Sequence, residues 1–178
     1  MNTKYIDLIN QTFDFPQEEF KIDSNKNLHF HDIDTMKLVE QFGTPLKFTY
    51  LPKISQNIQQ AKEWFHKSMK THKYKAKYHY CYCTKSSHFK HVLDEALKND
   101  IHIETSSAFD IDIVESLKKE GKITDKTYIL CNGFKRDEYI TNIQRLINNG
   151  HKNCIPIIDN YEEIGLLTEG TKKKINIG

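Results

Sequence analysis

One lysine closes a short run of aromatic and thiol side chains, and that position gives its amine a chemistry of its own. The run covers residues 78–85 and reads YHYCYCTK. Because side chains alternate along a strand, the tyrosines fall on one face, and the thiols and Lys85 fall on the other. Lys85 would emerge at the carboxyl end of the strand, where partial burial favours the neutral amine, a nucleophile toward carbonyl groups. A solvated lysine is the alternative.

The cysteines are the second group with potential chemistry. All four, Cys81, Cys83, Cys131 and Cys154, lie in or beside apolar, strand-like segments. The inferred compartment is reducing, so we expect free thiols. Cys81, Cys83 and the nearby His79 resemble part of a metal site, but a fourth ligand and a second paired motif are missing. We therefore predict small core residues and no metal.

Strand-like and helix-like patterns alternate from residue 46 onward, and they must position Lys85. The predicted strands are 77–84, 101–105, 126–131, 155–159 and 173–177, and the predicted helices are 54–69, 87–99, 109–120, 136–149 and 161–168. Such alternation predicts a parallel α/β architecture. No glycine-rich dinucleotide fingerprint follows the strand at 77–84, so a (β/α)8 TIM barrel is favoured over a Rossmann fold.

The chain has fewer strands than a barrel requires. A (β/α)8 barrel needs eight strands and typically about 250 residues. The 178 residues present supply about five strands, so we expect the amino-terminal part of a longer protein. Residues 1–45 form a leading segment, with predicted helices at 5–11 and 34–42 and a strand at 28–31. Residues 46–178 form the partial barrel.

Composition excludes several classes of protein. The chain is 38% hydrophobic and 28% charged, with a net charge of +2. No apolar run approaches the ~20 residues that span a bilayer, and no secretory signal opens the chain, so we expect a cytoplasmic protein. The basic stretch 67–77 is interpreted as a solvated connection between a helix and a strand, and no nucleic-acid or membrane partner is expected.

Four segments together resemble a known family. They are FGTPL at 42–46, the lysine-bearing strand at 78–85, IETSS followed by AFDIDIV at 103–114, and ILCNGFKRDEYI at 129–140. In this order they resemble the alanine-racemase-fold decarboxylases that depend on pyridoxal 5′-phosphate (PLP). That group includes ornithine, diaminopimelate and biosynthetic arginine decarboxylases, and the resemblance covers about residues 28–178. The segment at 129–140 is most similar to the arginine branch.

The resemblance implies roles for individual residues. Lys85 matches the lysine that binds PLP covalently, and Glu104 matches a position lining the cofactor pocket. Asn132 and Lys135 fall in a loop on the substrate side of the barrel mouth. Asp110 stands where a glutamate is usual. The alternatives are an ordinary strand-end carboxylate for Glu104, a solvated Lys135, and a helix-start residue for Asp110.

The implied activity is decarboxylation of a basic amino acid. Arginine is the favoured substrate, giving agmatine and CO2 for polyamine and spermidine biosynthesis, and diaminopimelate and ornithine are the alternatives. A non-catalytic PLP-binding homologue or an inactive fragment is the alternative of another class, and we expect this fragment alone to be inactive. The resemblance also implies Mg2+ as a further cofactor and a homo-oligomer. Four serines, as helix caps or cofactor contacts, complete the candidates: Ser86, Ser87, Ser106 and Ser107.

Overall fold

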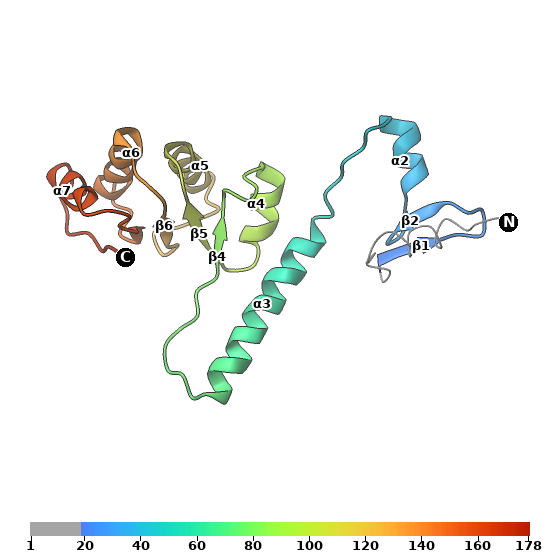
Figure 1. Ribbon diagram of the computed structural model, residues 1–178, viewed down its shortest axis with the longest axis horizontal. Coiled ribbons are helices and arrows are strands. Elements are labelled where there is room, and N and C mark those ends of the chain that lie inside the picture. Colours follow the sequence, from blue (N-terminus) through green and yellow to red (C-terminus); the bar gives the residue numbers. More distant parts are fainter. Residues whose placement is uncertain (1–18) are drawn as a thin grey trace. The chain divides into compact units, whose positions relative to one another are not determined.

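The computed structural model describes residues 19–178, which belong to two compact units, Met1–Thr49 and Tyr50–Gly178 (Figure 1). The division falls four residues after the predicted start of the barrel at residue 46. The predicted helix at 5–11 lies outside the described residues, as does the stretch considered for a secretory signal. Within residues 19–178, no helix is both long and apolar enough to cross a membrane.

The first unit contains a small antiparallel sheet and one helix. Its strands are β1 (Phe20–Ile22), β2 (Leu28–Phe30) and β3 (Ile33–Asp34), and its helix is α2 (Thr35–Phe42). Asp34 caps the helix by accepting hydrogen bonds from the backbone N–H groups of Met36 and Lys37. Gly43 follows the helix with a φ of 79°, which glycine adopts without steric cost. The predicted strand at 28–31 and helix at 34–42 are confirmed.

The second unit is built on a four-stranded parallel sheet. Its strands, in spatial order, are β4 (Cys81–Cys83), β5 (His102–Thr105), β6 (Ile129–Cys131) and β7 (Cys154–Pro156). The helices are α3 (Pro52–Thr71), α4 (Lys90–Leu97), α5 (Ala108–Lys119), α6 (Asp137–Asn148) and α7 (Glu162–Glu169). Spatial order equals chain order, as in a (β/α)8 barrel, whereas a doubly wound sheet reverses its order.

Within residues 19–178, the helices that follow the strands lie on one face of this sheet. Figure 1 shows α4, α5, α6 and α7 following one another along the sheet. The strand residues on the helix side are buried, among them Ile103, Ile129 and Cys154, whereas Glu104 and Leu130, whose side chains alternate to the other face, are partly exposed. On β4, the ring of Tyr82 packs against the core on the helix side.

The predicted strands of the barrel are longer than those of the structure, most of all at 77–84, and the one at 173–177 is absent. The strand at 77–84 is shorter, because its partner β5 begins at His102, which pairs with Cys81. The segment 173–177 is no strand; only Gly178 bonds to the edge of β7, donating to the Pro156 carbonyl at 3.0 Å and accepting from the Ile158 N–H at 3.0 Å. Lysines at 172–174 offer little apolar surface to a sheet.

The predicted serine cap of the helix at 87–99 is also wrong. Helix α4 begins at Lys90, and the residue before it, Phe89, makes no capping hydrogen bond through its side chain. The carbonyl of Ser87 instead accepts a hydrogen bond from the hydroxyl of Tyr82 at 3.0 Å. The chain therefore needs three more residues to turn from β4 into its helix than the serine suggested.

Candidate active site

Lys85 lies in the turn directly after β4. This turn is tied to the neighbouring strand by Thr84, which donates its N–H and its hydroxyl to the Glu104 carbonyl at 3.0 and 3.1 Å. Within residues 19–178, the amine of Lys85 has no hydrogen-bond or ion-pair partner. Its side chain is exposed, so the partial burial expected from the sequence is not observed. Lys85 therefore lies at the carboxyl end of β4 with its side chain in contact with solvent.

A groove of about 600 Å³ opens beside this amine. It is lined by Lys85, His88, Ser106, Ser107, Phe109, Asp110 and Ile113. The lining thus combines a free amine with two hydroxyls and apolar surface from the first turns of α5. Such a mixture suits a small ligand that has both an aromatic and a polar part.

The Asp110 carboxylate already accepts hydrogen bonds from residues just before helix α5. Its Oδ2 atom accepts a hydrogen bond from the Ser106 N–H at 2.9 Å and another from the Ser107 hydroxyl at 3.0 Å. The carboxylate is 6% exposed and sits in the first turn of α5, where negative charge is stabilised. This arrangement favours the helix-start role over a ligand contact for Asp110.

Glu104 and Asn132 meet at the carboxyl ends of β5 and β6. The Asn132 side-chain amide donates to Glu104 Oε1 at 3.1 Å, and its oxygen accepts the Gly133 N–H at 2.9 Å. The structure therefore brings together two of the residues to which the resemblance gives roles. Within residues 19–178, no hydrogen bond joins Lys85 to either of them; Lys85 lines a groove together with Ser106.

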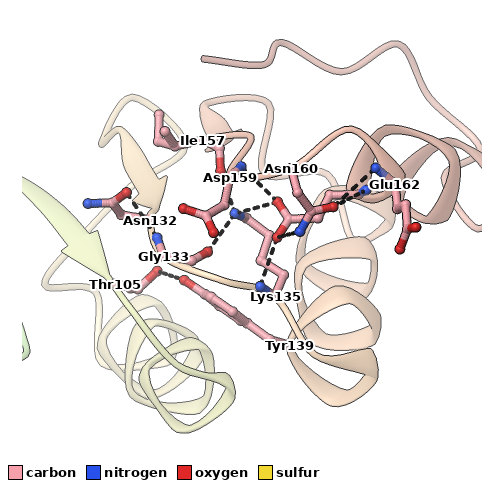
Figure 2. Close-up of polar contacts among 10 residues, drawn as sticks. Thr105, Asn132, Gly133, Lys135, Tyr139, Ile157, Asp159, Asn160 and Glu162 are labelled. Carbon is pink, nitrogen blue, oxygen red and sulfur yellow. Dashed lines mark hydrogen bonds and ion pairs between the residues drawn. The ribbon is translucent and has the colours of Figure 1, made fainter.

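Lys135 is buried, so its solvated alternative is wrong. The side chain has no exposed surface, and its ammonium group donates three hydrogen bonds (Figure 2): to the Gly133 carbonyl at 2.8 Å, to the Ile157 carbonyl, and to Glu163 Oε2 at 3.0 Å. All three N–H groups of the ammonium are used. None is left for a substrate, so the structure gives Lys135 a different place from the predicted substrate contact.

Glu163 is the residue that sequence reasoning missed. Besides the Lys135 ammonium, its carboxylate accepts hydrogen bonds from the N–H groups of Lys135 and Asp159 at 2.9 and 3.1 Å and from the Asn160 amide at 3.3 Å. Burial alone would raise the pKa of Glu163, but these hydrogen bonds and Lys135 hold that pKa below its ordinary value. The sequence signal was slight: Glu163 is one of two acidic residues in the first turn of α7.

The cysteines, and the side chains within residues 19–178 that could bind a metal ion, are arranged as follows. All four cysteines are free, as expected, and the Sγ atoms of Cys131 and Cys154 lie 3.6 Å apart in the core. No group of three or more metal-ligating side chains forms within the described part of the chain, so no residues there are assigned to Mg2+.

Comparison with known proteins places this fold. No protein-family model matches the sequence, and no curated protein matches it either. Diaminopimelate decarboxylase from M. jannaschi superposes with a TM-score of 0.71 and 20% identity, over 90% of this chain and 35% of that one. Biosynthetic arginine decarboxylase SpeA from Campylobacter jejuni superposes with a TM-score of 0.65 and 22% identity, over 90% of this chain and 29% of that one.

The chain thus spans about a third of the length of the solved structures that it matches. Both matches are decarboxylases of the group that the four sequence segments resemble. At these identities the likeness concerns the fold, and it agrees with the sequential parallel sheet and its single layer of helices. The chain therefore has the fold of part of the barrel of the alanine-racemase-fold decarboxylases.

Proposed function

We propose that the protein is a PLP-dependent decarboxylase of a basic amino acid, with arginine as its substrate and agmatine and CO2 as its products. The observation that carries this proposal is the free amine of Lys85, directly after a barrel strand, in a chain whose fold is that of two decarboxylases. A buried or paired lysine could not bind a carbonyl cofactor without losing its contacts. Lys85 has no such contacts to lose within residues 19–178.

The residues around Lys85 fit the proposed cofactor. A phosphorylated aromatic aldehyde needs an amine to hold its carbonyl carbon, hydrogen-bond donors for its oxygens, and apolar surface for its ring. The groove offers Lys85, the hydroxyl of Ser106, and the side chains of Phe109 and Ile113, whereas the Ser107 hydroxyl already donates to Asp110. When bound, PLP supplies an electron sink for the bond to the departing carboxylate.

The chain's own residues have separate tasks in this proposal. Lys85 would hold the cofactor through its amine, and PLP would supply the carbonyl carbon for that bond. Glu104, which the resemblance places in the cofactor pocket, would also supply negative charge that favours a cationic substrate, and its hydrogen bond to Asn132 fixes the direction of the carboxylate. Choosing arginine over diaminopimelate or ornithine rests on the resemblance of residues 129–140 to the arginine branch.

The first experiment tests the anchor. The complete protein, loaded with PLP, is reduced with borohydride, and the labelled peptide is mapped; we expect the label on Lys85. Lys85→Ala should lose the label and the visible absorbance, whereas Lys90→Ala should keep both, because Lys90 is an exposed lysine paired with Glu120. A label on any other lysine refutes the site.

The second experiment tests substrate and class. Release of CO2 is measured separately with arginine, diaminopimelate and ornithine; we expect arginine to give the highest kcat/KM. A labelled Lys85 without CO2 from any of them would favour a non-catalytic PLP-binding protein. We further propose a cytoplasmic homo-oligomer that supplies agmatine to polyamine biosynthesis, which size-exclusion chromatography and agmatine measurement in cells would test.

A further inference from the structure

Two loops at the carboxyl edge of the sheet are joined by one buried ion pair. The loop at 132–136 follows β6, and the loop at 157–161 follows β7. Lys135 from the first loop and Glu163, just after the second, lie 3.0 Å apart, with side chains that are 0% and 1% exposed. In Figure 2, Lys135 lies between Gly133 of the first loop and Asp159 and Asn160 of the second.

The hydrogen bonding of this pair is complete. The Lys135 ammonium donates its three N–H groups to three different acceptors. The Glu163 carboxylate accepts hydrogen bonds from that ammonium, from two backbone N–H groups and from the Asn160 amide. Stability alone does not require such an arrangement, because apolar residues of similar volume stabilise a protein interior equally well or better. The pair instead orients the backbone of the two loops. It holds two carbonyl and two N–H groups that would otherwise turn toward water.

The pair reaches the candidate site through Gly133. This glycine has a φ of 76°, and its peptide groups are held on both sides: its carbonyl by the Lys135 ammonium at 2.8 Å, and its N–H by the Asn132 side chain at 2.9 Å. The amide end of Asn132 is then directed to Glu104 at 3.1 Å. A continuous chain of contacts therefore runs from the buried pair to the Glu104 carboxylate.

We propose that Lys135 and Glu163 are positioning residues, which hold Asn132 and through it the Glu104 carboxylate in the direction that receives the cationic substrate. This role rests on the proposed function. It differs from direct substrate binding by Lys135, whose ammonium is saturated. Glu163 acts on the substrate side only through the loop at 132–136.

Hydrogen–deuterium exchange on the complete protein tests the link between the loops without any assay of activity. In Glu163→Gln we expect the segments 132–136 and 157–161 to exchange at least about tenfold faster together, because the amides of Lys135 and Asp159 lose an anionic acceptor. Glu115→Gln is the matched control: it weakens the exposed ion pair with Arg145 on the helix side. It should leave both loops unchanged, and loosening of only one loop in Glu163→Gln overturns the proposal.

A double-mutant cycle tests whether the loops act on the site. We expect Asn132→Ala and Glu163→Gln each to lower kcat/KM about tenfold or more, since small misplacements of positioning groups are costly. Combined, they should cost no more than the larger single loss, because both act through one contact. The labelling of Lys85 should not change. Additive losses, or unchanged kcat/KM in Glu163→Gln, overturn the positioning role.

Misfolding of a variant and failure of the proposed function must each be distinguished from failure of the positioning role. If Glu163→Gln does not fold, the double variant Lys135→Met/Glu163→Leu removes both charges and leaves no buried ion unpaired; it should show the same coupled exchange and the same non-additivity with Asn132→Ala. If the wild-type protein carries no label on Lys85 or releases no CO2, the proposed function fails. The exchange experiment still decides whether the pair couples the two loops.

Discussion

Removing the Lys135 ammonium tests how much a buried, fully hydrogen-bonded ion pair contributes to this fold. The change is Lys135→Met, which keeps an unbranched side chain of similar length. It leaves Glu163 as a carboxylate that is 1% exposed, 3.0 Å from where its counter-charge was. The Gly133 and Ile157 carbonyls lose their donor at the same time.

The magnitude follows from that geometry. At 3.0 Å the Coulomb attraction of two unit charges is roughly 5.5 kcal/mol for an effective dielectric constant of about 20. Desolvation of the lysine, which the variant no longer requires, offsets part of this loss. Measured removal of one partner from a buried pair costs about 3–5 kcal/mol, and we expect Lys135→Met to lie in that range. Since a domain has only about 5–15 kcal/mol to lose, its native state should be marginal.

The assay is urea unfolding followed by circular dichroism, repeated between pH 7 and pH 4. In the wild type the pKa of Glu163 is lowered, so its contribution to the free energy of unfolding is present above the ordinary value of 4.5 and is lost as the pH falls through the folded-state value. In Lys135→Met the unpaired carboxylate binds a proton more readily, and the cost of the substitution should shrink as the pH falls. A cost below about 1 kcal/mol at pH 7, or one that does not shrink in acid, would refute the account of the pair.

Three further predictions follow from other contacts. Burial and then a neighbouring histidine lower the pKa of His102 below 6.5, so the free energy of unfolding should fall as the pH falls below that value; His102→Asn keeps an acceptor for the Tyr128 N–H and should flatten that part of the pH profile. Tyr139→Phe removes the hydroxyl that lies 2.8 Å from the Thr105 hydroxyl in the core, and urea unfolding should show a loss of about 1–1.5 kcal/mol. Lys85→Arg should abolish borohydride labelling and decarboxylation as completely as alanine does, because a guanidinium remains protonated; retained labelling would sink the assignment.

The sheet could be predicted from the sequence because its signal is local and repeated. Each βα unit shows a short apolar run followed by a helical pattern, and four such units gave four of the five predicted strands. Strand ends could not be predicted, because pairing with the neighbouring strand sets them: β4 begins only where β5 can bond to it. The predicted strand at 173–177 failed because its lysines offer little apolar surface to a sheet, and only Gly178 bonds beside β7.

The candidate site likewise contains contacts that the sequence could predict and contacts that it could not. The capping role of Asp110 could be predicted from the sequence because its partners, Ser106 and Ser107, lie four and three residues away. The partners Lys135 and Glu163 are separated by 28 residues and meet only because β6 and β7 are adjacent. No local pattern distinguishes a loop lysine that will be buried from one that will remain in water.

Two lysines at the same edge of the sheet therefore differ in what they can do. Lys85 and Lys135 each follow a parallel strand, β4 and β6 respectively, and the sequence alone does not distinguish their roles. Every N–H group of the Lys135 ammonium is bound to the protein, so converting it to a neutral nucleophile would break three contacts in the interior. The amine of Lys85 has no such contacts within residues 19–178 and borders a groove that can admit a ligand. We therefore propose covalent chemistry for the unpaired lysine and positioning for the saturated one, because only the former can exchange its proton without breaking contacts in the fold.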